Sequence, residues 1–287
     1  MKVKVIIVNA FVDGRKGGNP AGVVLDADRL SGKQKLELAR QVGLSETAFV
    51  SKSDSADFKL DFYTPHKQIA HCGHATIATF SLLSQLGLVK NQQTSKETID
   101  GNRAIEVLGD FVYMEQAKPK YADTAPNISD ICQILGINES RTISPPAIVS
   151  TGNSFLILGT KTLKDLQSLT PSYTKIAEMS EKYNLIGFYI FSLETNSSNR
   201  DASTRMFAPH YGIKEESATG MAAGPLACFL HDQMKLNKEI FYIEQGYSMQ
   251  PASPSCIKVV LSREGKVIKK LKAGGVGVAS RNAEIEI

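Results

Sequence analysis

The sequence predicts an α+β protein of two pseudo-symmetric lobes, in which each lobe is a curved sheet wrapped around one buried central helix. Three observations indicate this. The chain has 287 residues, a length that suits one large domain or two lobes better than one small core. Its two halves repeat the same order of motifs. Each half also contains a helical segment that is apolar on every side, and such a helix has to be buried by its surroundings.

The early parts of the two halves correspond closely. In the first half, Gly18-Asn19 precedes the run AGVVL, and Ser31 precedes an amphipathic helix and the strand LSETAFV. In the second half, Gly152-Asn153 precedes SFLILG, and Thr170 precedes the helix PSYTKIAEMSEKYN and the strand LIGFYIF. Ser or Thr before apolar residues at helical spacing is typical of an N-cap, because its oxygen accepts from a free backbone N–H. The order of elements therefore repeats.

The later parts of the halves supply the two central helices. The segments LDFYTP and RMFAP each end a strand on an aromatic residue, which one further residue separates from a proline. A glycine then opens an apolar helix, at Gly73 and at Gly220. Prolines and charges collect in EQAKPKYADTAPN between them. We therefore predict an N-terminal lobe over residues 1–118 and a C-terminal lobe over 119–287, and leave open a return of the last strand to the first lobe.

Composition excludes several classes of protein. The formal net charge is only +4, the basic residues are scattered and there is no Trp, so nucleic acid is not an expected partner. The four cysteines form no CxxC pair, and no apolar run is long enough to span a membrane. The start MKVKVIIVNAF has the pattern of a first strand rather than of a signal peptide. These features predict a cytoplasmic protein without a membrane partner.

The two glycine turns before the central helices are candidate anion sites. A helix N-terminus presents unpaired N–H groups and a partial positive charge. Glycine at Gly73-His74 and Thr219-Gly220 allows a ligand to approach the backbone closely. One interpretation is a cradle for a substrate carboxylate. The other is ordinary helix capping.

Glu46 interrupts the apolar pattern of its segment. In a strand over Leu44–Val50, period-two alternation places Glu46 on the same face as Ala48 and Val50. The equivalent position in the second half is Gly187. A carboxylate that only one half carries is a candidate acid/base for proton transfer. The alternative is a solvated glutamate at the start of a strand.

Other polar residues cluster near the same two turns. His71 and His74 have the spacing of a metal pair, but no further set of ligands recurs at suitable spacing, so we predict no metal site. Cys72 lies where a helix start would stabilise a thiolate, or is simply a small buried side chain. The pair Glu215-Glu216 either caps the second helix or supplies a second carboxyl group. The sequence leaves open whether Glu215 or Glu216 would face the pocket.

At this point the motifs resemble a known family. GGNPAGVVLDAD, LSETAFV, FYTPHKQIAHCGHAT, RMFAPHYGIKEESATG and EQGYSM are similar, in order and spacing, to those of the phenazine-biosynthesis F-type (PhzF-like) isomerases. The resemblance extends from about Val8 to Gly277. It implies the diaminopimelate-epimerase-like fold, usually a homodimer, and an isomerase whose founding member acts on trans-2,3-dihydro-3-hydroxyanthranilate without any cofactor.

The resemblance also implies roles for individual residues. Glu46 matches the family's acid/base glutamate, His74 its motif histidine, and Gly73 and Gly220 its helix-start glycines. Glu216 and Met221 stand where the phenazine enzyme has aspartate and serine, so the substrate is expected to differ. The predicted catalytic residues are Glu46, His74 and Glu216. The predicted substrate-binding residues are Asn19, Ser45, Cys72, Gly73, Thr219, Gly220 and Met221.

These observations lead to one hypothesis and two rivals. The hypothesis is a cofactor-independent isomerase that moves a proton on a small carboxylate substrate by means of a single glutamate. The first rival is a Cys-dependent epimerase or racemase of an amino acid. The two-base mechanism of such enzymes requires a thiol at each helix start. Cys72 occupies the first position, but Thr219 occupies the second. The second rival is a non-catalytic protein that binds a small acid on the same fold.

Overall fold

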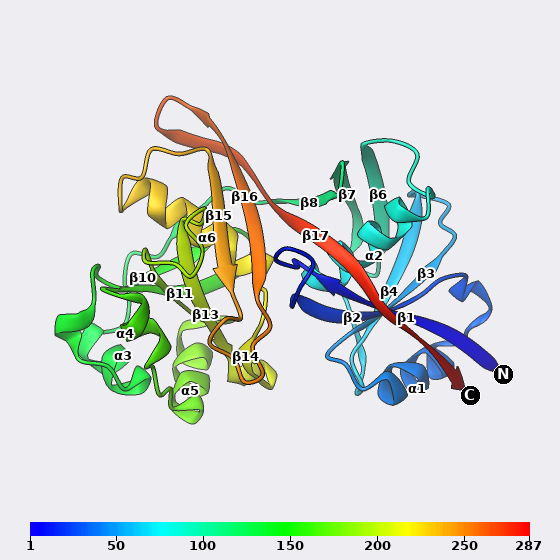
Figure 1. Cartoon of the computed structure of the whole chain (residues 1–287), viewed down its shortest axis with the longest axis horizontal. Helices are drawn as coiled ribbons and strands as arrows, with labels where there is room; N and C mark the ends of the chain where they lie inside the picture. Colours follow the sequence, from blue (N-terminus) through cyan, green and yellow to red (C-terminus); the bar gives the residue numbers. More distant parts are fainter. The chain divides into compact units, whose positions relative to one another are not determined.

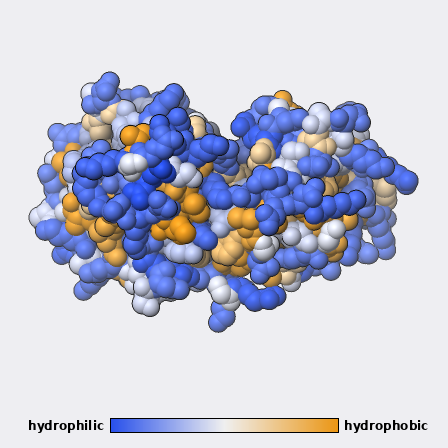
Figure 2. Space-filling view, turned by 90° about the horizontal axis from the view of Figure 1, so that it is seen from above, coloured by the Kyte–Doolittle hydropathy of each residue, from blue (hydrophilic) through white to orange (hydrophobic).

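The chain divides into two units, and the computed structural model describes all 287 residues. The first unit is Met1–Glu115 together with Gly274–Ile287, and the second is Gln116–Ala273. In each unit a sheet surrounds one buried helix (Figure 1), as the sequence predicts. None of the helices combines the length and the apolar character needed to span a membrane. Hydrophilic residues cover most of the visible surface, with hydrophobic residues in small groups between them (Figure 2).

The sheet of the first unit closes on itself. Its strands pair in the order β1, β2, β3, β4, β6, β7 and β8, and both β1 and β8 pair with β17. Closure leaves this ring without an open edge. The strands are β1 (Lys2–Ala10), β2 (Asn19–Val24), β3 (Thr47–Ser51), β4 (Phe58–Tyr63), β5 (Gln68–Ile69), β6 (Gln93–Thr98), β7 (Gly101–Leu108), β8 (Phe111–Gln116) and β17 (Val267–Glu286), of which the part from Gly274 onward belongs to this unit.

Two α-helices complete the first unit. Helix α1 (Gly32–Val42) begins at the predicted N-cap Ser31, whose side chain forms a capping box with Gln34. It packs through Leu38 and other apolar residues in one cluster with side chains of β1–β4. Helix α2 (Gly73–Gln85) packs against β1, β2 and β3. Every residue of α2 from Gly73 to Leu83 is buried, so the expected central helix is confirmed.

The second unit repeats this plan with more helices. Its strands pair in the order β9, β10, β11, β12, β13, β15 and β16, and β14 pairs with β13. The strands are β9 (Lys120–Tyr121), β10 (Ala147–Ser150), β11 (Ser154–Thr160), β12 (Gly187–Ser192), β13 (Ala202–Ala208), β14 (Ile213–Glu216), β15 (Ile240–Gln245) and β16 (Ser255–Glu264). The helices are α3 (Ile128–Leu135), α4 (Leu163–Gln167), α5 (Tyr173–Tyr183) and α6 (Gly220–Asp232). Short 3-10 turns lie at Ala27–Arg29, Glu139–Arg141 and Pro209–Tyr211.

Helix α6 is the central helix of the second unit. It contacts β10, β11 and β16, and all of its residues from Ala222 to His231 are buried. The other helices, α3, α4 and α5, share a separate apolar cluster with β10–β13. Helix α5 begins after Ser172, which makes no side-chain cap. The prediction of Thr170 as its N-cap is therefore wrong.

The strand registers show how the two halves correspond. Thr47 of β3 lies opposite Gly22 of β2 and Tyr63 of β4. Phe188 of β12 lies opposite Leu156 of β11 and Phe207 of β13, which are the residues that match Gly22 and Tyr63 in the sequence repeat. Glu46 and Gly187, the residues before Thr47 and Phe188, therefore correspond, as the sequence repeat indicates. Glu46 itself is not part of a strand, because the chain bends at residues 44–45 and β3 begins only at Thr47. The prediction of Glu46 on an alternating strand face is therefore wrong.

Packing explains why the second unit has glycine at this position. A Cβ on Gly187 would lie 2.1 Å from the backbone oxygen of Phe207. The neighbouring strand β13 thus excludes any side chain there. Only the first unit has space for a glutamate at the corresponding point.

Replacing this glycine is expected to destabilise the protein. Gly187→Ala forces β12 away from β13, and overpacking of this kind costs about 1–3 kcal/mol. Chemical denaturation measures the loss of unfolding free energy. Gly32→Ala is the matched control, since its Cβ would meet only the Tyr63 hydroxyl, at 3.3 Å, and alanine favours the helix. Equal stability of Gly187→Ala and the wild type would contradict the packing explanation.

Candidate functional site

The start of α2 brings several predicted site residues together in the first unit. Cys72 is the N-cap residue, and its side chain makes no capping hydrogen bond. Gly73 and His74 follow as the first two helical residues and are buried. The Thr76 hydroxyl donates to the Cys72 carbonyl oxygen at 2.6 Å. This bond fixes the Cys72 carbonyl group. The N–H groups at the start of α2 are not capped by the Cys72 side chain.

Glu46 lies against this turn. Its Oε2 is 3.2 Å from His74 Nε2, and the two side chains are only 14% and 6% exposed. The Glu46 backbone is fixed to the sheet, because its carbonyl accepts from the Gly22 N–H at 3.1 Å. A carboxylate and an imidazole thus meet at the beginning of a buried helix.

Cys72 extends this contact into a short chain of three side chains. Its Sγ lies 3.6 Å from His74 Nδ1. Cys72 and Glu46 therefore lie against different nitrogens of the same ring. Glu46, Cys72 and His74 also offer three potential metal-donor atoms within 4.8 Å of one another. A single imidazole nitrogen coordinates one ion, so the placement of the two groups at opposite nitrogens suits separate contacts with the ring better than a shared metal.

The remaining predicted residues of the first unit lie differently. Asn19 is buried at the first position of β2. Ser45 is exposed in the bend before Glu46. The structure thus groups Glu46, Cys72 and His74 without Ser45.

The start of α6 carries the predicted residues of the second unit. The Thr219 hydroxyl donates to Glu216 Oε2 at 2.6 Å. Gly220 follows as the first residue of the helix, and its carbonyl oxygen accepts from Gln116 Nε2 at 2.8 Å. Met221 is partly buried, with its sulfur 3.3 Å from Asn153 Nδ2. A carboxylate again lies beside the start of the central helix.

The structure distinguishes the two adjacent glutamates. Glu215 accepts two hydrogen bonds from Arg205, at 2.9 and 2.8 Å. Arg205 also donates to the Leu169 carbonyl oxygen, at 3.1 Å. This ion pair connects β14 to Arg205 of the neighbouring strand β13. Glu216, rather than Glu215, lies at the helix start.

Gln245 is a residue of this region to which sequence reasoning assigned no role. Its Nε2 donates to the Glu216 carbonyl and to Thr219 Oγ1, at 2.6 and 3.1 Å. Its Oε1 accepts from the Thr219 N–H and the Tyr189 hydroxyl, at 3.2 and 3.0 Å. Burial raises the pKa of Tyr189, which keeps that hydroxyl a donor. The sequence signals are the polar EQ pair that ends the apolar strand β15 and the place of Gln245 in the EQGYSM motif.

Comparison with known proteins places the chain in a family. The family model for phenazine biosynthesis-like proteins matches residues 8–283. An uncharacterized isomerase of Clostridium acetobutylicum is 30% identical, with 94% of each chain covered. The trans-2,3-dihydro-3-hydroxyanthranilate isomerase of Pseudomonas chlororaphis is 28% identical, with 95% of each covered. A Bacillus anthracis structure of the PhzF family is 25% identical, covers both chains fully and has a TM-score of 0.91.

More distant structures share only the fold. A probable proline racemase from Agrobacterium radiobacter is 12% identical, covers 99% of this chain and 93% of its own, and has a TM-score of 0.61. The predicted α+β fold of epimerase type is thereby confirmed, and so is the resemblance noted in the motifs. The chain belongs to the PhzF family of phenazine biosynthesis-like proteins.

Proposed function

We propose that this isomerase moves a proton within a small carboxylate substrate, with Glu46 as the acid/base and without a cofactor. The observation that carries the proposal is the contact of 3.2 Å between the nearly buried Glu46 and His74 at the start of α2. A carboxylate so placed is within reach of a ligand bound at the helix N-terminus. General acid/base catalysis of this kind contributes about 10²–10⁴ in rate.

The proposed reaction uses the groups at the α2 start in order. The N–H groups and the positive end of the helix dipole bind the substrate carboxylate. Glu46 takes a proton from one carbon of the substrate, and the same carboxylic acid returns it to another carbon as the double bond shifts. The His74 imidazole, 3.2 Å from the Glu46 carboxylate, orients it. The substrate and the product have the same atoms and electrons, so the step requires no oxidant or reductant.

The relatives suggest a class of substrate. One of them is named for the isomerisation of trans-2,3-dihydro-3-hydroxyanthranilate, a cyclic acid with an activated C–H bond. We infer a related dihydro-aromatic acid for this chain. Glu216 and Met221 replace the aspartate and serine of the phenazine enzyme, which changes both the reach of a carboxylate and a hydrogen-bond donor. The proposal gives Glu216 the role of polarising or reprotonating a substrate.

Loss of the Glu46 carboxylate is expected to remove the activity. Glu46→Gln keeps the size of the side chain and cannot accept a proton, so the rate should fall by about 10²–10⁴. The measurement is NMR of the substrate in D₂O, which follows both isomerisation and uptake of deuterium. Glu37→Gln is the control, because the Glu37 side chain is 43% exposed on α1 and pairs with Arg40 and Gln41 of the same helix. Equal deuterium uptake by wild type and Glu46→Gln would show that Glu46 is not the base.

A Cys-dependent epimerase is the second candidate, because Cys72 Sγ contacts the imidazole of His74 at 3.6 Å. The two candidates differ in what Cys72→Ala does. The glutamate mechanism predicts that the variant keeps most of the activity, since the thiol transfers no proton. The same D₂O assay, with the melting temperature as a check on folding, decides between them. Complete loss of activity in a folded Cys72→Ala protein would favour the epimerase.

The two adjacent glutamates are expected to respond in opposite ways. Glu215→Gln leaves the nearly buried Arg205 without its charged partner, and breaking such a pair typically costs about 3–5 kcal/mol. Glu216→Gln removes the charge but keeps an oxygen that can accept from the Thr219 hydroxyl, so stability should change little while activity falls. Denaturation and activity assays on both variants test this. The opposite pattern would assign the functional carboxylate to Glu215.

A further inference from the structure

Lys96 is a buried lysine to which the proposed reaction gives no role. It lies on β6, where Thr94, Lys96 and Thr98 alternate toward the interior of the first unit. Its exposed fraction is 0%. Lysine is almost never fully buried unless it is paired with an opposite charge. Its presence at this point therefore requires a reason.

The partners of the Lys96 ammonium are all neutral. Its Nζ donates to Thr76 Oγ1 at 2.6 Å, and lies 3.0 Å from His71 Nδ1 and 4.8 Å from the centre of the Phe62 ring. Burial lowers the pKa of His71 to about 3, so the imidazole stays neutral and accepts. Three donors of the ammonium thus have three partners, but no carboxylate forms an ion pair with it.

The nearby charges offset the burial of Lys96 only in part. Asp100 and Arg103 both act on it electrostatically, in opposite directions, and form an ion pair with each other at 2.7 Å. Cys72 acts on it as well, in the sense that favours the charged form. Burial is the largest effect and lowers the pKa of Lys96 to about 7. Its charge therefore changes near neutral pH.

The fold does not require a lysine at this point. Lys96 pairs with Phe58 across β4 and β6, and Ile243 pairs with Ala202 across β13 and β15. The registers that align the two halves also align these pairs, so Ile243 occupies the position of Lys96 in the second unit. Ile243 is fully buried. An apolar residue can thus fill the corresponding position in the sheet.

Lys96 is connected to the start of α2 by two hydrogen bonds. Its ammonium donates to Thr76 Oγ1, and the Thr76 hydroxyl donates in turn to the Cys72 carbonyl oxygen at 2.6 Å. Cys72 directly precedes the first helical residue, Gly73. The cation therefore lies directly behind the turn that the proposed function assigns to the substrate carboxylate.

We propose that Lys96 is the buried countercharge of the α2 start, which strengthens carboxylate binding while it is protonated and loses this effect when it is not. It is a positioning residue, because it acts through Thr76 and the helix turn. The inference rests on the proposed function, which places a carboxylate at this turn. Below pH 7 the ammonium is charged and binding is strong. Above pH 7 binding requires uptake of a proton, so affinity decreases as the pH rises.

The first test needs no ligand. In NMR titrations with labelled lysine, the Lys96 side chain should titrate near pH 7, and the Gly73 and His74 amides should show a transition at the same midpoint. In Lys96→Met this transition should be absent. Melting curves at pH 6 check that the variant folds, which we expect because it removes a buried charge that has no ion-pair partner. A Lys96 midpoint near pH 10, or an unchanged transition in Lys96→Met, would overturn the inference.

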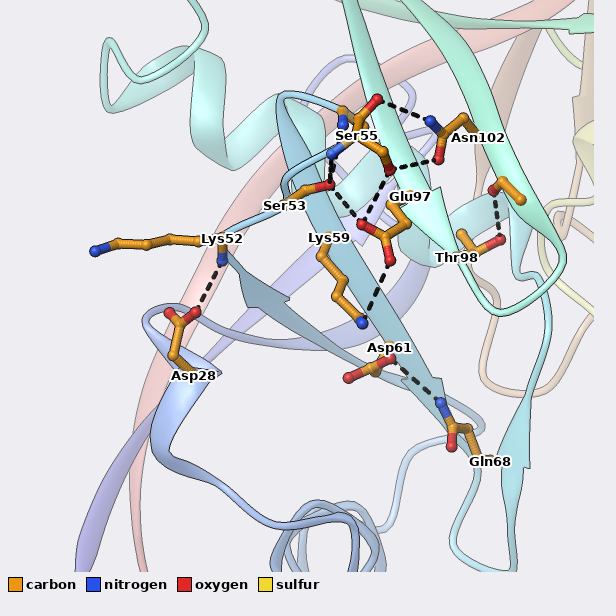
Figure 3. Close-up of polar contacts among 12 residues, drawn as sticks. Asp28, Lys52, Ser53, Ser55, Lys59, Asp61, Gln68, Glu97, Thr98 and Asn102 are labelled. Carbon is orange, nitrogen blue, oxygen red and sulfur yellow. Dashed lines mark hydrogen bonds and ion pairs between the residues drawn. The ribbon is translucent and has the colours of Figure 1, made fainter.

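Lys59→Met is the matched control for both tests. Lys59 lies on the neighbouring strand β4, is 40% exposed and pairs with Glu97 of β6 at 3.4 Å (Figure 3). An exposed pair of this kind contributes little to stability. The control makes the same substitution close to β6 without touching the buried ammonium. Its amide transitions and its ligand affinity should equal those of the wild type.

The second test measures binding of anthranilate by calorimetry between pH 6 and 9, with the uncharged anthranilamide for comparison. Wild-type affinity should fall by up to about tenfold per pH unit above 7. Lys96→Met should bind weakly at pH 6 and show no such dependence. Equal affinity and pH dependence in both proteins would overturn the inference. If the wild type binds no anthranilate at any pH, the proposed substrate class fails, and the NMR titration alone decides the role of Lys96.

Discussion

The burial of a helix that has no polar face is the constraint on which the rest of the structure depends. Helix α2 is buried from Gly73 to Leu83, and the sheet of the first unit closes around it through β17. Water cannot reach the sides of such a helix. The unpaired N–H and C=O groups at its ends are therefore the parts of the helix that can bind other groups. The candidate site follows from this arrangement. Glu46, Cys72 and His74 all gather at the beginning of the helix.

The same constraint acts in the second unit with a different result. Helix α6 is equally buried, and Glu216, Thr219 and Gln245 form a hydrogen-bonded set at its start. The position that corresponds to Glu46 is Gly187, whose Cβ would overlap the β13 backbone. A duplicated fold thus supplies two similar helix starts, and packing lets only one of them carry the glutamate. This asymmetry supports a mechanism with one base rather than two.

Much of this organisation was predictable from sequence, because apolar periodicity and capping residues are local signals. The repeat, the two central helices and the N-cap at Ser31 are confirmed. The strand position of Glu46 is wrong, since the bend at residues 44–45 depends on how the chain enters the sheet. The partners of Glu215 and the place of Lys96 were not predictable either. Each depends on a contact between two elements that meet only in the folded sheet, Glu215 with Arg205 of β13 and Lys96 with Thr76 of α2.

The central claim is that the start of α2 binds a carboxylate within reach of Glu46. A crystal structure of the protein with bound anthranilate tests it most directly. The account predicts density for the acid with its carboxylate within hydrogen-bond distance of the Gly73 or His74 N–H, and with the Glu46 carboxylate facing a ring carbon. Anthranilate bound far from this turn, with Glu46 directed away from it, would contradict the account.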